Sequence, residues 1–79
     1  MKTYVFIFAE KSGDFVAVDH VSVIRRLRYV YALEHAKSCL IVGRCDGHYV
    51  GKRCVVWCIE DHAMWELVCK PDGFVEVFC

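Results

Sequence analysis

The sequence contains few of the features that mark membrane, secreted or disordered proteins. No apolar run approaches the roughly 18 residues of a membrane-spanning helix, and charged residues follow the first apolar stretch too closely for a signal peptide. One proline, five glycines and 57% hydrophobic residues are not the composition of a disordered chain. We therefore expect a folded cytoplasmic protein that makes no membrane contact.

Catalytic groups are also missing from any arrangement that would let them act together. The four histidines are scattered, and no serine and aspartate stand where they would form a nucleophilic triad with one of them. The paired carboxylates Glu60 and Asp61 adjoin a predicted turn, and the glycines do not form a phosphate-binding loop. The sequence thus predicts a protein that is not an enzyme and uses no cofactor.

Six cysteines among 79 residues are the most unusual feature that is present. Without a secretion signal, cysteines are expected to stay reduced and to pack as small apolar side chains. A chain of this length is expected to form a single small domain, residues 1–79, near the size at which one core only just stabilises a fold.

Alternating apolar residues predict a first hairpin, with strands over residues 3–10 and 15–21. A Ser12-Gly13 turn would set Lys11 opposite Asp14, and would align residues 9 with 16 and 7 with 18. Residues 22–39 follow without glycine or proline and are predicted to form a helix. Its helical periodicity places one apolar stripe on the sheet: Val23, Ile24, Leu27, Val30 and Tyr31.

The second half reads as a meander of about four strands. Asp46-Gly47 is a strong hairpin signal, and Pro71-Asp72-Gly73 is an equally good turn. Residues 61–67 fit either a strand or a short helix. The expected fold is α+β, with order ββαββββ, or ββαβββ if those residues are helical, and consists of a twisted antiparallel sheet with one helix packed on one face.

The stretch CDGHYVGKRCVVWC, residues 45–58, resembles a set of zinc ligands. A hairpin turning at Asp46-Gly47 would pair Cys45 with His48 and Cys39 with Cys54, all on one face. These two pairs would lie about 20 Å apart at 3.3 Å per residue, whereas zinc ligands lie within about 2.3 Å of one ion. We therefore predict no metal site within the hairpin, although Cys39 and Cys54 could form a disulfide. A zinc-stabilised module would need further ligands, from His20, His62, Cys69 or Cys79.

Basic residues are concentrated in the middle of the chain. Residues 25–53 carry seven lysines and arginines against two acidic residues, and residues 54–79 carry one lysine against five. On the predicted helix, Arg25 and Arg28 lie one turn apart with Tyr29 beside them, suited to a phosphate or carboxylate-rich partner. We expect three further residues to support this basic surface: Arg44, Lys52 and Arg53. The alternative is a solvated face whose arginines pair with Glu60, Asp61 or Glu66.

One face of the first predicted hairpin is aromatic, and the helix is expected to pack on the opposite face. An exposed aromatic patch on so small a protein usually marks a protein contact. The residues of this expected contact are Tyr4, Phe6, Phe8 and Phe15. A homodimer, or coverage by another part of the chain, would bury them.

Together these features predict a small non-enzymatic interaction or inhibitor protein that binds a larger protein or a protein–nucleic-acid complex. Small proteins of viruses and mobile elements that inhibit host defence systems are of this size and lack catalytic residues. Direct nucleic-acid binding by the basic helix is the alternative, and a zinc-stabilised module is the third hypothesis.

Overall fold

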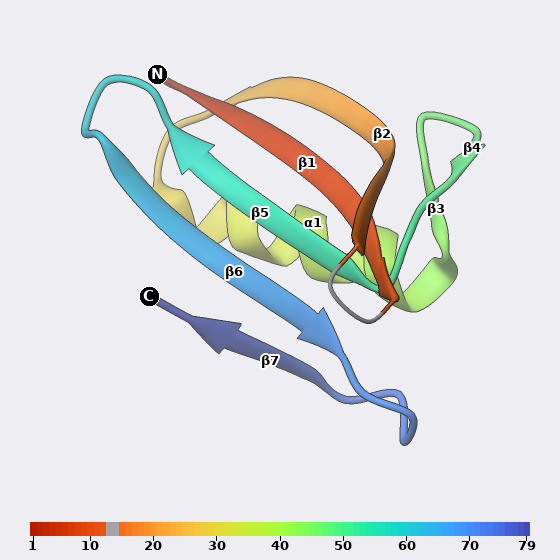
Figure 1. Ribbon diagram of the computed structural model, residues 1–79. Helices are drawn as coiled ribbons and strands as arrows, with labels where there is room; N and C mark the ends of the chain where they lie inside the picture. The colour runs from red at the N-terminus through yellow and green to blue at the C-terminus, as the bar shows by residue number, and fades with distance from the viewer. Residues whose placement is uncertain (13–14) are drawn as a thin grey trace.

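A computed structural model describes residues 1–12 and 15–79 of the chain. In this part of the protein one helix packs on one face of a five-stranded antiparallel sheet, with strand order β2-β1-β5-β6-β7, and a two-stranded ladder stands beside it (Figure 1). The expected α+β fold is confirmed. The elements are β1 (Lys2–Ser12), β2 (Phe15–Arg26), α1 (Tyr29–Val42), β3 (Arg44–Cys45), β4 (His48–Tyr49), β5 (Arg53–Cys58), β6 (Ala63–Cys69) and β7 (Val75–Phe78).

The second strand is longer than predicted, and the helix begins later. Residues 22–26 belong to β2, which pairs with β1 as far as Lys2 and Arg26. Val21 and Val23 are exposed while Ser22 between them is buried, which is the two-residue period of a strand. Pairing along the whole of β1 therefore prevails over the helical periodicity, and the predicted helix start at residue 22 is wrong.

The face of α1 that packs on the sheet also differs from the prediction. Its buried residues are Ala32, Ala36, Cys39 and Leu40. The predicted stripe is largely exposed, with Leu27 outside the helix and Val30 and Tyr31 facing solvent. Alanines meet the sheet because its covered face already carries large aromatic rings, so that a small-residue surface is needed for close packing.

The register of the first hairpin is shifted from the prediction. Ala9 pairs with Val18 and Ile7 with Val21, and Ser12 is opposite Phe15, whereas the predicted turn would have placed Lys11 opposite Asp14. The predicted Lys11–Asp14 pair involves residue 14, which lies outside the described residues. Between Ala9–Val18 and Phe8–His20 the register changes by one, which leaves Asp19 as the additional residue of a β-bulge. The bulge brings His20 to the face of the sheet that carries α1.

Strands β5, β6 and β7 form a meander as predicted, but β3 and β4 form a separate two-stranded sheet, so the described second half has five strands where about four were expected. The Asp46-Gly47 turn is present, with φ of 51° and 81°, and Cys45 pairs with His48. Both central residues have positive φ, as a type I′ turn requires. The hairpin is short, because residues 39–42 are helical, so Cys39 and Cys54 are not cross-strand partners. Residues 63–69 form a strand, and the helical alternative for residues 61–67 is wrong.

Candidate functional site: the open face of the sheet

The helix covers the aromatic face of the sheet, which was predicted to be the exposed one. Tyr4, Phe6 and Phe8 are at most 1% exposed and form the core with α1. The prediction that they form a partner surface is therefore wrong, and the side chain of Phe15 lies outside the described residues. Strands β2 and β5 both pair antiparallel with β1 and are connected through α1. Such crossovers are nearly always right-handed, so handedness decides which face the helix covers.

The opposite face of the sheet is apolar, and no element among the described residues covers it (Figure 1). Strand alternation and the observed register place apolar side chains from all five strands on it. We call this surface the open face; its exposed or half-buried apolar residues are Val5, Ile7, Val18, Val21, Val23, Val55, Trp57, Met64, Val68 and Phe78. Val23, Met64, Val21 and Trp57 are 61%, 59%, 53% and 41% exposed. Because these side chains are neighbours in the register of the sheet, they form one contiguous apolar surface that is exposed to solvent.

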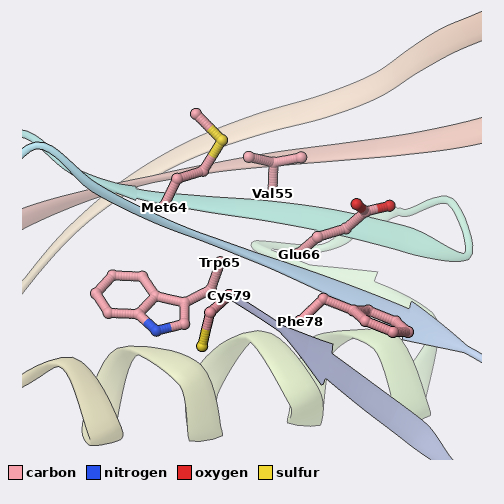
Figure 2. Close-up of a pocket in the computed structure, with 6 residues that line it drawn as sticks. All are labelled: Val55, Met64, Trp65, Glu66, Phe78 and Cys79. Atoms are coloured by element: carbon pink, nitrogen blue, oxygen red, sulfur yellow. The ribbon is translucent and has the colours of Figure 1, made fainter.

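One ion pair, Arg53 with Glu66, lies on the open face. The Arg53 guanidinium donates a hydrogen bond to Glu66 Oε1 at 2.9 Å, so this ion pair matches the solvated alternative that the sequence left open. Figure 2 shows Val55, Met64 and Glu66 on the side of the sheet away from α1, whereas Trp65 lies on the side toward the helix. The hollow among them holds about 170 Å³, less than the roughly 300–1,000 Å³ of small-molecule sites. The open face is therefore suited to a large, flat partner.

The predicted basic surface is not brought together by the fold. Arg25 lies opposite Thr3 and Arg53 opposite Ala9, which puts six residues of β1, or about 20 Å, between the two arginines.

The remaining residues of that surface are divided between the same two ends. Arg28 precedes α1 as its exposed N-cap, and Tyr29 stacks on Trp65 with ring centroids 5.3 Å apart. At the other end, Arg44 lies over the Tyr49 ring and donates a hydrogen bond to its hydroxyl, and the exposed Lys52 directly precedes Arg53 in the chain. Two small groups of cations thus replace the single basic helix that the sequence suggested.

Two of the buried thiols, those of Cys39 and Cys54, have raised pKa values. Burial raises the pKa of Cys39 to about 12, and its neighbour Cys45 contributes to the rise. Burial raises the pKa of Cys54 to about 12 as well. The thiolate is the nucleophile in cysteine chemistry, and the raised pKa values leave little thiolate at Cys39 and Cys54 at neutral pH.

Histidine and cysteine side chains gather where α1, β2 and the β3–β4 hairpin meet. The ligand atoms of His35, Cys39 and Cys45 all lie within 4.8 Å of one another, as do those of His20, Cys45 and Asp46. His48 is opposite Cys45 in the hairpin, and its ring stacks on His20 with centroids 4.8 Å apart. The sequence prediction missed the part played by His35. The i, i+4 spacing of His35 and Cys39 within the predicted helix was the available signal.

Comparison with known proteins gives no relative for this chain. No protein-family model, curated protein or solved structure matches it. Within the described residues, no helix has the length and apolar character to cross a membrane.

Proposed function

We propose that this protein is a non-enzymatic interaction protein, of the class that includes small inhibitors of larger proteins, and that it acts by packing its open face on another protein chain. The observation that carries the proposal is the uncovered apolar surface of Val21, Val23, Trp57 and Met64. Apolar surface of this kind is stabilised by removal from water, at roughly 25 cal/mol per Å².

The dimensions of the open face suit a protein interface. Five strands spaced at about 4.8 Å and about six residues per strand give a footprint of roughly 24 by 20 Å. That footprint is about 480 Å² before side-chain relief is counted, somewhat more than half of the roughly 800 Å² that each partner contributes to a standard interface. Two sheets can pack face to face about 10 Å apart with their side chains interdigitated.

The occupant that we propose is a second copy of this chain. The open face is largely apolar, and the charges of Arg53 and Glu66 on it compensate each other, so this pair does not repel a second copy in a two-fold arrangement. A nucleic acid is a poorer occupant, because phosphate binding needs several unpaired cations on one surface. A larger protein or nucleoprotein complex would bind the same surface. With such an occupant, the isolated chain is expected to remain monomeric.

Sedimentation equilibrium of the wild type and of the Val23→Glu/Met64→Glu variant tests the proposal. The wild type is expected at twice the chain mass of 9.1 kDa. Two charges buried without partners are expected to weaken dimerisation at least 100-fold, since each costs several kcal/mol on desolvation. The variant should be a monomer with an unchanged far-UV circular dichroism spectrum.

Ile41→Glu is the matched control, because Ile41 is 66% exposed and belongs to α1. This control is expected to dimerise like the wild type. Equal dimerisation of the control and the open-face variant would refute the assignment of the open face, and a monomeric wild type would refute the second copy as occupant.

A further inference from the structure

Three potential metal ligands lie close together at the end of α1. His35 and Cys39 are one helical turn apart and therefore share a helix face. The helix ends at Gly43, whose left-handed φ of 74° turns the chain while its N–H bonds to Cys39 O at 2.8 Å. This turn brings Cys45 of β3 back to the same place, so that the three ligand atoms lie within 4.8 Å of one another.

A fourth side chain reaches this place from the sheet. His20 follows the β-bulge of β2, and its ligand atom lies within 4.8 Å of those of Cys45 and Asp46. The Nε2 atom of His20 is buried without a hydrogen-bond partner among the described residues. A buried nitrogen without a partner is costly, and a metal ion would give it one.

We propose that His35, Cys39, Cys45 and His20 bind one divalent metal ion of the zinc class. Two cysteines and two histidines are the donor set of tetrahedral structural zinc sites, and softer thiolate and imidazole ligands disfavour magnesium and calcium. Zinc–ligand bonds of 2.0–2.3 Å imply ligand atoms about 3.3–3.8 Å apart in a tetrahedron. Within each of the two ligand groups, separations of up to 4.8 Å require a contraction of about 1 Å. His20 is grouped with Cys45 but not with His35 and Cys39, so its side chain must in addition rotate toward these two ligands.

Asp46 lies beside this site and contacts residues around it. Its Oδ2 accepts a hydrogen bond from Ser22 Oγ at 2.9 Å and lies 4.0 Å from His20 Nε2. Partners of this kind, outside the ligand set, position metal ligands and tune their basicity. The ion would connect α1, β2 and the β3–β4 hairpin, and the inference does not depend on the open face, which is on the other side of the sheet.

Titration of the wild type with Co²⁺ and Zn²⁺ tests the site. One equivalent of Co²⁺ is expected to produce thiolate-to-cobalt charge-transfer absorption, and one equivalent of Zn²⁺ to remove it. Free Zn²⁺ at 100 times its Kd is expected to raise the melting temperature by roughly 10–20 °C. Affinity should fall as the pH is lowered, because the thiols lose protons when they bind the metal.

Cys45→Ser removes the residue common to both ligand groups and should abolish the charge-transfer absorption. Cys69→Ser is the matched control, because Cys69 belongs to β6 and is in neither group; it should bind like the wild type. His35→Gln keeps both thiols and should lower zinc affinity at least 10-fold, so it provides a test should Cys45→Ser fail to fold. Wild-type protein that shows no charge-transfer absorption, or a His35→Gln variant with unchanged affinity, would overturn the proposal.

Discussion

Replacing Ala36 with arginine is expected to unfold the protein at room temperature. Ala36 is fully buried where α1 meets the aromatic face of the sheet. A guanidinium there would have to displace the helix or lose its hydration without a partner, which costs several kcal/mol. A domain of this size has only about 3–5 kcal/mol of stability to lose. Urea denaturation followed by circular dichroism gives the change in the free energy of unfolding.

Tyr31→Arg is the matched control for Ala36→Arg, since Tyr31 is on α1 and 53% exposed. Its free energy of unfolding should stay within about 0.5 kcal/mol of the wild type. The helix face expected from the sequence alone would reverse this order, with Tyr31 toward the sheet and Ala36 toward solvent. A stable Ala36→Arg variant would therefore contradict the orientation of α1.

Phe6→Ala is expected to destabilise the protein by about 3–5 kcal/mol. Phe6 is fully buried and lies edge-on to Phe8, with ring centroids 6.2 Å apart. Truncation would remove that contact and leave a cavity beneath α1. The change should appear as a lower midpoint of urea unfolding with the same dependence on urea concentration.

A change on the open face should have a much smaller effect on the folded monomer. Val23→Ala removes a side chain that is 61% exposed in β2. To remove the effect of dimerisation, Val23→Ala is made in a Met64→Glu background. We expect the free energies of unfolding of Val23→Ala/Met64→Glu and Met64→Glu to differ by less than about 1 kcal/mol. Equal destabilisation by Phe6→Ala and Val23→Ala would contradict the finding that α1 covers one face of the sheet and leaves the other uncovered.

Local signals in the sequence predicted the Asp46-Gly47 and Pro71-Asp72-Gly73 turns and the strand-rich second half. Asp46-Gly47 specifies its own conformation, because both residues tolerate positive φ. The α+β class followed from one glycine-free and proline-free segment among β-rich runs. These features are encoded by neighbouring residues and need no knowledge of the tertiary structure.

The limits of the helix and the side on which it packs depend on contacts that are distant in the sequence. Ser22, Val23 and Ile24 fit a helical stripe and a strand equally well, and pairing with β1 decides between them. Both faces of the first hairpin are apolar, so side-chain pattern alone does not choose the covered face. The crossover from β2 to β5 makes that choice. The helix therefore covers the surface that was predicted to be a contact site, and the open face on the other side of the sheet stays uncovered.

The metal ligands illustrate the same limit. A two-stranded arrangement of residues 39–54 separates its cysteine pairs by about 20 Å, which excluded a site within the hairpin. In the fold, Cys39 is helical and His20 arrives from β2 through a bulge. Neither the helix end nor the bulge has a signature strong enough to place these ligands from the sequence.

Quenching of Trp57 fluorescence by acrylamide tests the central claim most directly. Trp57 is on the open face, whereas Trp65 stacks on Tyr29 on the helix side; Trp65→Phe therefore leaves a single reporter on the open face. Burial between two copies predicts that quenching of Trp57 falls as the protein concentration is raised and is restored by Val23→Glu/Met64→Glu. Quenching that stays equally efficient at every concentration would contradict the account.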